Sequence, residues 1–175
     1  KGGAELRTLE ARQLPEAAGR LIEEKMLGPM KAGEEAGMKT RFSHEELKKK
    51  VVEVGEALDL RAEVEYVLDD YRYDVAFIKP EKNVVPWAVV EIHVGGDLYK
   101  DLASLQHAWD HRRSIPIYVV GDEDDRKRAK NKIQSDFDKL KEVIVLLSAG
   151  ELEDLYKALR SEAVRRLVRA LLLGP

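Results

Sequence analysis

Three residues with metal-binding or proton-transfer side chains lie in one apolar stretch of the chain, DVAFIKPEKNVVPWAVVEIHV. Asp74 and Glu91 are equally far from the turn residues Lys82 and Asn83, so they face each other if the stretch folds as a hairpin. Cross-strand partners have Cβ atoms roughly 4.5–5.5 Å apart, and two carboxylates that close repel unless a cation lies between them. His93, two residues after Glu91, belongs to the same face of its strand. We therefore expect Asp74, Glu91 and His93 to form one cluster around Mg²⁺ or Mn²⁺, since carboxylate oxygens suit a hard cation.

A glutamate in a strand can also have a purely structural place. Glu91 could face solvent at the end of a sheet, or pair with Lys79 or Lys100. The flanking residues AVV and I, however, indicate burial on both faces of the strand, and a buried carboxylate is costly unless it is paired or bound to metal. The residues alone leave both interpretations open.

The elements that would position this cluster are a helix and a three-stranded meander. Ser43 and Glu46 have the spacing of a capping box, and apolar residues then recur at helical intervals, which predicts a helix over about 44–58. The runs RAEVEYVL, YRYDVAFIK and VVPWAVVEIHV are strand-like and are separated by turn-forming DD and PEKN. Their spacing favours antiparallel pairing.

The rest of the chain alternates helices with strands. Asp97 can cap a helix, IPIYVV and VIVLL are expected strands, and GDEDDRKRAKNKIQSDF begins a helix between them. A last helix is predicted from about Glu151 to Leu172, and its leucine stripe by default packs on the sheet and less often forms a homodimer. The expected order from residue 43 is αβββαβαβα, an α/β domain whose mixed sheet is covered by helices on both faces. Residues 1–42 are predicted to be an N-terminal helical extension, and residues 43–175 the α/β domain.

Helix, meander with an Asp and then a Glu-X-Lys-like triplet, crossover helix and further strand together resemble the core of the PD-(D/E)XK, or restriction-endonuclease-like, nuclease superfamily. Residues 43–120 carry the resemblance. It implies an αβββαβ core in which Asp74 and Glu91 bind the catalytic metal. It also implies an assisting acid on the first helix, for which Glu46 is the first choice and Glu53 the second. Gln106 is similar to a glutamine that some branches of the superfamily carry on the crossover helix.

The chain departs from the motif at two positions. Tyr73 stands where the motif has proline, which is a common variation, and His93 stands where it has lysine. In the superfamily that lysine is thought to position or deprotonate the attacking water and to stabilise developing charge. Histidine can accept a proton near neutral pH but supplies less positive charge. Lys100 could supply a displaced ammonium; otherwise the domain has lost catalysis and kept binding.

Other groupings carry weaker signals. His107 and His111 stand four residues apart, a zinc-compatible spacing, but no third ligand accompanies them, and surface histidines are the more common case. The basic run RKRAKNK is usually a solvated helix face, yet it could grip a phosphate backbone. We take as nucleic-acid-binding candidates Arg126, Lys127, Arg128, Lys130 and Lys132. The arginines of the last helix are the alternative patch.

Composition limits the classes of function. Charged residues make up 36% of the 175 residues and the net charge is −3, so a nucleic-acid partner must be held by a local basic patch. Cysteine is absent, which excludes disulfides and thiolate metal sites. Without a long apolar run, we expect a cytoplasmic protein with no membrane partner, and its many charged residues resemble thermophile compositions. The sequence thus predicts a metal-dependent DNA nuclease, RNA not being excluded, with a catalytically impaired nuclease-fold binding protein as the alternative.

Overall fold

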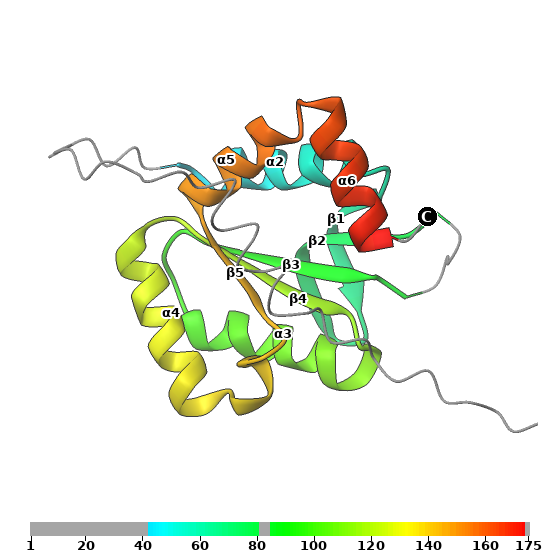
Figure 1. Ribbon diagram of the computed structural model, residues 1–175. Helices are drawn as coiled ribbons and strands as arrows, with labels where there is room; N and C mark the ends of the chain where they lie inside the picture. Colours follow the sequence, from blue (N-terminus) through cyan, green and yellow to red (C-terminus); the bar gives the residue numbers. More distant parts are fainter. Residues whose placement is uncertain (1–41, 81–84, 174–175) are drawn as a thin grey trace, which may run out of the picture. The chain divides into compact units, whose positions relative to one another are not determined.

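The computed structural model describes residues 42–80 and 85–173, and it places five strands in one mixed sheet with the order β1-β2-β3-β4-β5 (Figure 1). The first three strands pair antiparallel, and β3–β4 and β4–β5 pair parallel. The strands are β1 (Arg61–Leu68), β2 (Tyr71–Ile78), β3 (Ala88–His93), β4 (Ile115–Val120) and β5 (Val145–Ser148). The predicted α/β class with a mixed sheet is confirmed.

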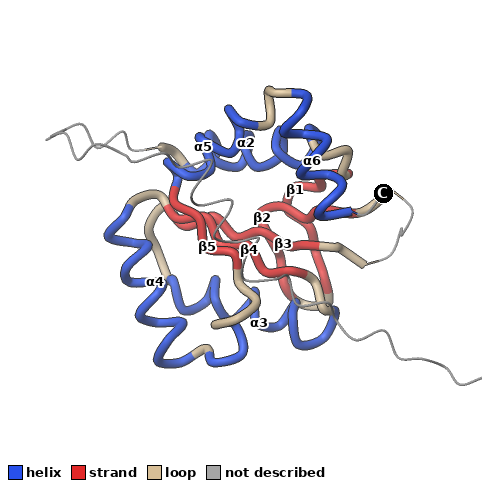
Figure 2. The backbone as a smooth tube through the Cα atoms, in the orientation of Figure 1, coloured by secondary structure: helices blue, strands red, loops and turns tan. Residues whose placement is uncertain are grey.

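Helices cover both faces of this sheet. Figure 1 shows α2, α5 and α6 on one side of the strands and α3 and α4 on the other, and Figure 2 shows the same layers with the strands in red. The helices among the described residues are α2 (His44–Ala57), α3 (Leu98–Arg112), α4 (Glu123–Asp136), α5 (Ala149–Ala158) and α6 (Glu162–Leu173), with a short 3₁₀ turn η1 (Asp138–Leu140).

Each layer of helices has its own buried apolar cluster against the sheet. On the α2 side, Leu47 and Leu152 pack with Val90 and its neighbours. On the α3 side, Leu105 and Tyr118 pack with residues from α4 and from the other face of the same strands. Alternation along the strands supplies apolar side chains to both clusters, so the sheet is buried on both faces.

Side-chain caps fix where the helices begin, largely as predicted. Ser43 and Glu46 form the expected capping box of α2, and Asp97 accepts from backbone amides at the start of α3. Asp122 does the same for α4. These caps set the phase of each helix and hence which side chains it turns toward the sheet.

Two predicted boundaries are wrong. The third strand begins at Ala88 rather than in the VVPW segment, because Pro86 has no amide proton to give to a ladder. The last helix is two helices rather than one, with a break from Leu159 to Ser161. The Ser161 carbonyl accepts from Arg165, so a new helix starts there instead of α5 continuing. The extension 1–42 lies, except for Phe42, outside the described residues.

Candidate active site

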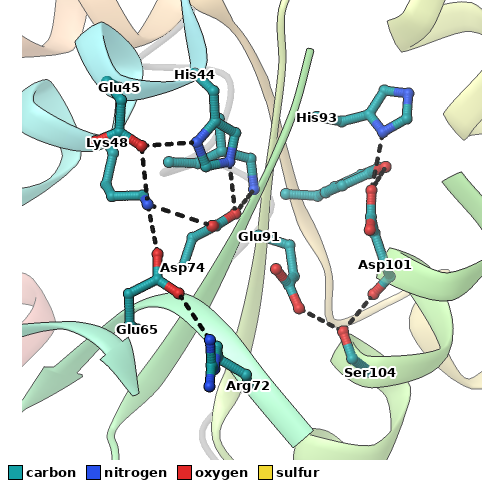
Figure 3. A network of polar contacts seen from close by, with 12 residues as sticks. His44, Glu45, Lys48, Glu65, Arg72, Asp74, Glu91, His93, Asp101 and Ser104 are labelled. Atoms are coloured by element: carbon teal, nitrogen blue, oxygen red, sulfur yellow. Dashed lines mark hydrogen bonds and ion pairs between the residues drawn. The ribbon is translucent and has the colours of Figure 1, made fainter. Parts of the chain in front are cut away.

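The pairing of β2 with β3 ends at Val75 and Val90, although both strands continue beyond these residues. This register is the one predicted, and one further step along it sets Asp74 opposite Glu91. Beyond this point, hydrogen bonds made by side chains replace the backbone pairing of the two strands. Asp74 Oδ2 accepts from the Ile92 amide at 2.8 Å, and the Glu91 carboxyl accepts from the Asp74 amide. Two carboxyl groups thus line the place where the strands separate (Figure 3).

The Asp74 carboxylate is turned toward α2. Its Oδ2 lies 3.1 Å from His44 Nε2, and its Oδ1 lies 3.8 Å from the Lys48 ammonium. Lys48 is only 12% exposed and also contacts Glu65 at 2.5 Å and Glu45 at 3.2 Å. Burial lowers the pKa of Lys48, but these carboxylates raise it more, so the net shift is upward and the side chain stays a cation.

The Glu91 carboxyl is turned toward α3, on the other side of the sheet. It is 8% exposed, and its Oε1 lies 2.6 Å from the Ser104 hydroxyl oxygen. Burial, followed by the negative charges of Asp74 and Asp101, raises the pKa of Glu91 to about 8, against the opposing hydrogen bond from Ser104. Glu91 is therefore largely protonated at neutral pH, unlike an ordinary surface glutamate.

His93 is fully enclosed beneath α3. Its Nδ1 lies 2.8 Å from Asp101 Oδ2, which also accepts from the Tyr118 hydroxyl at 3.0 Å. A carboxylate oxygen only accepts, so Nδ1 carries a proton, and Nε2 is the acceptor atom of the neutral ring. His93 Nε2 is buried with no hydrogen-bond partner among the described residues. The ring is thus held in one tautomer with a free acceptor atom.

Glu91 and His93 lie on one face as expected, but Asp74 does not join them. Along β2, Val75 and Phe77 belong to the α2-side cluster, whereas Tyr73 belongs to the α3-side cluster, so the regular alternation breaks at Asp74. The neighbouring residue of β1, Glu65, has a positive φ of 51° and is skipped in the β1–β2 pairing. This local irregularity turns Asp74 toward α2. Convergence of all three side chains on one face is therefore not what the structure shows.

The other proposed catalytic residues lie apart from this carboxyl pair. Glu46 is exposed and occupied by its capping box with Ser43, and Glu53 is ion-paired with Lys49. Lys100 is exposed in the first turn of α3, and Gln106 is half-buried further along the same helix. His44, Lys48, Asp101 and Ser104 are the contacts that sequence reasoning missed. The spacing of His44 and Lys48 on one face of the predicted first helix was the available signal.

The two histidines of zinc-compatible spacing lie against each other with their rings tilted. The rings of His107 and His111 lie 4.4 Å apart, and Tyr71 stacks on His107 at 4.3 Å. His107 Nε2 lies 3.2 Å from Asp69, which also binds Arg112. This agrees with the surface role that the sequence favoured for these histidines.

No protein-family model, curated protein or solved structure matched the chain. Within residues 42–80 and 85–173, no three His, Asp or Glu side chains are grouped closely enough to hold a metal ion as they stand. In the same ranges, no helix is long and apolar enough to cross a bilayer.

Proposed function

We propose that this domain is a divalent-metal-dependent nuclease that hydrolyses DNA phosphodiester bonds, with Asp74 and Glu91 at its centre. One observation carries the proposal: the carboxyl groups of Asp74 and Glu91 lie where the pairing of β2 with β3 ends, Asp74 turned toward α2 and Glu91 toward α3. The element order from α2 to β4 agrees with the core of the PD-(D/E)XK superfamily, which the motif residues also resemble.

The donors at this gap fit Mg²⁺ or Mn²⁺ in their chemistry. Oxygen atoms from adjacent strands are available, and the pKa of Glu91 is raised in part because Asp74 and Asp101 place negative charge around it. A cation there would relieve this repulsion, and Asp74 and Glu91 would hold it once the Asp74 carboxylate turned from the α2 side toward Glu91. When bound, the metal would polarise the phosphoryl oxygen and activate a water. Since Glu91 must first lose its proton, we expect metal affinity to rise between pH 6 and pH 8.

Lys48 supplies the positive charge that His93 cannot. Its ammonium lies 3.8 Å from Asp74, its pKa is raised, and it comes from α2 rather than from the strand. A fixed ammonium beside Asp74 can stabilise charge that develops on a phosphate. We therefore assign to Lys48 the role for which the sequence suggested Lys100. His93, held by Asp101 with Nε2 as an acceptor, remains the candidate for orienting water.

The direct test is cleavage of a labelled duplex DNA with Mg²⁺ or Mn²⁺ and with chelator. Wild type should cut only with metal, and Asp74→Asn should lower the rate about 100-fold or more because it removes a negative ligand while keeping the side chain's shape. Asp70→Asn, at an exposed aspartate of the β1–β2 turn, is the matched control and should cut normally. Cutting that ignores both Asp74→Asn and Glu91→Gln would place the active site elsewhere.

A second candidate is a nuclease-fold protein that binds nucleic acid or a protein partner without cutting. The burial of His93 and the partners already held by both carboxyl groups favour it. An inert wild type across metals and substrates, with activity restored by His93→Lys in a variant that still melts cooperatively, would support this candidate. Loss of activity in Lys48→Met but not in Lys49→Met would instead support the active enzyme.

A further inference from the structure

A groove runs between α4 and the segment that leads into β5, on the α3–α4 side of the sheet. Its volume is about 500 Å³, and its floor includes the apolar side chains of Ile144 and Leu146. Four cations line it: three from α4 and one from the turn after η1. They are Arg126, Lys127, Lys130 and Lys141.

Two of these four cations are ion-paired within the protein, and the other two are available to a ligand. Arg126 is ion-paired with Glu151 at 2.9 Å, and Lys141 contacts Asp138. Lys127 and Lys130 are exposed, lie three residues apart on one face of α4, and have no ion pair within the described ranges. Glu123 also lines the groove, 3.6 Å from Arg126, so the unpaired positive charge of the groove is that of Lys127 and Lys130.

The basic run of α4 is therefore divided between two sides of the helix. Arg128 pairs with Asp125, and Lys132 pairs with Asp136 at 2.7 Å, and neither of the two cations lines the groove. The five candidates that the sequence grouped together thus do not all line this groove. Lys127 and Lys130 line the groove, whereas Arg128 and Lys132 do not, so the two pairs can be compared by mutation.

The dimensions of the groove suit a chain of phosphates. Its α4 wall extends from Glu123 to Gln134, roughly 16 Å at 1.5 Å per helical residue. That length matches the rise of about five nucleotides along one strand. The apolar floor offers packing for sugar edges between the charged contacts, which an isolated lysine on an open helix face would not offer.

The groove also begins near the proposed active site. The amide of Gly121 donates to the carbonyl of His93 at 2.8 Å, so the chain enters α4 beside the end of β3. Figure 2 shows α4 flanking the sheet next to β5. A nucleic-acid strand that lies along α4 toward its N-terminus would reach the end of β3, where Glu91 and His93 lie.

We propose that the groove between α4 and β5 binds the sugar–phosphate backbone of a single nucleic-acid strand, with Lys127 and Lys130 contacting phosphates. This inference rests on the proposed function, because it names how that site would receive its substrate strand.

The test is fluorescence anisotropy of a labelled single-stranded DNA 20-mer with the full chain, in chelator so that no cutting occurs. Lys127→Gln/Lys130→Gln should bind at least 10-fold more weakly near 50 mM salt, and the slope of log affinity against log salt should fall by about 1.4, or roughly 0.7 per lost phosphate contact. Arg128→Gln/Lys132→Gln removes the same charge from the same helix and should change affinity less than 2-fold.

Three results would overturn the groove: unchanged binding in the first variant, equal losses in both variants, or competition by polyglutamate as strong as by unlabelled DNA. The last would indicate a site for acidic peptides. Binding that depends on Lys127 and Lys130 in a protein that never cuts would uphold the groove and refute the nuclease. Metal-dependent cutting that is unaffected in the first variant would uphold the nuclease and refute the groove.

Discussion

The carboxyl groups of Asp74 and Glu91, on adjacent strands, lie in different surroundings. Asp74 lies beside the Lys48 ammonium of α2, whereas Glu91 is enclosed beside Ser104, where burial raises its pKa and favours its neutral form. The Ser104 oxygen also lies 2.9 Å from the Asp101 carbonyl. Because the hydroxyl has one proton, it can donate to Glu91 or to this carbonyl but not fully to both.

The raised pKa of Glu91 predicts a pH-dependent stability. Its folded pKa of about 8 lies above the ordinary glutamate value of 4.5, so between these values the folded state holds a proton that the unfolded state releases. Stability should therefore fall as pH rises from about 5 to 8, by roughly 3–5 kcal/mol from this group. Glu91→Gln keeps a neutral side chain at every pH and should flatten the dependence.

Urea unfolding at several pH values measures this effect. Glu142→Gln, at an exposed glutamate, should retain the wild-type pH dependence. Identical pH profiles for wild type and Glu91→Gln would show that Glu91 titrates normally in the folded protein.

For these residues, the sequence predicted which residues lie side by side better than it predicted where their side chains point. The apolar flanks of Glu91 and its distance from the turn placed it opposite Asp74 and indicated its burial, and both are found. The positive φ of Glu65 has no sequence signal, since glycine and asparagine are the usual residues there. The turn of Asp74 toward His44 and Lys48 follows from that backbone and could not be foreseen.

Among the elements, α2 approaches the sheet closely at a glycine. A Cβ on Gly55 would lie 2.4 Å from Cε1 and 2.8 Å from Cδ1 of Phe77, whose side chain is buried in the α2-side cluster. Glycine in a helix interior normally costs roughly 0.5–1 kcal/mol relative to alanine. Here the close approach of the Phe77 ring accounts for it.

Gly55→Ala should lower the free energy of unfolding by about 2 kcal/mol, because overpacking outweighs the gain in helix propensity. Gly150→Ala, in the first turn of α5, is the control: its Cβ would meet nothing nearer than the Ser148 hydroxyl oxygen at 3.9 Å. That variant should be unchanged or up to about 1 kcal/mol more stable. Chemical denaturation of both variants decides the point, and a stabilised Gly55→Ala would refute the close packing.

The types and order of the elements could be predicted from helix caps and hydrophobic periodicity. Two boundaries were missed because the local residues that mark them stood inside a stronger apolar pattern. Pro86 stood inside an apolar run that otherwise read as strand, and Ser161-Glu162 stood inside a leucine repeat that otherwise read as one helix. Leu152 and Leu159 are buried as that repeat predicts, but Leu167 and Leu171 are not. The leucines of one repeat in the sequence are thus divided between two helices that differ in exposure to solvent.

For the molecule as a whole, the two apolar clusters carry the fold and α6 is attached to one of them by few contacts. Val168 packs against the α2-side cluster, and Arg169 contacts Asp59. Leu167 and Leu171 on the same helix are 59% and 60% exposed. The homodimer that the sequence left open stays a prediction, in which this exposed pair would be covered.

Alanine substitutions along α6 should separate these roles. Val168→Ala should cost about 1 kcal/mol of stability, since it removes buried methyl groups, whereas Leu167→Ala and Leu171→Ala should each stay within about 0.5 kcal/mol. Thermal unfolding at low concentration measures this. Large losses at both exposed leucines that grow with protein concentration would mean that they are buried between two chains.

The strand order of the sheet is also the order of synthesis. Every strand pairs with the one made just before it, so each new segment can join an edge that is already present instead of waiting for a distant partner. Such neighbour-to-neighbour growth keeps sequence separation between partners small, which favours fast folding. The meander with Asp74 and Glu91 can close while α4 and β5 are still being translated, and the basic groove forms last. A pulse-labelling experiment should accordingly find amides of β2 and β3 protected before those of β5.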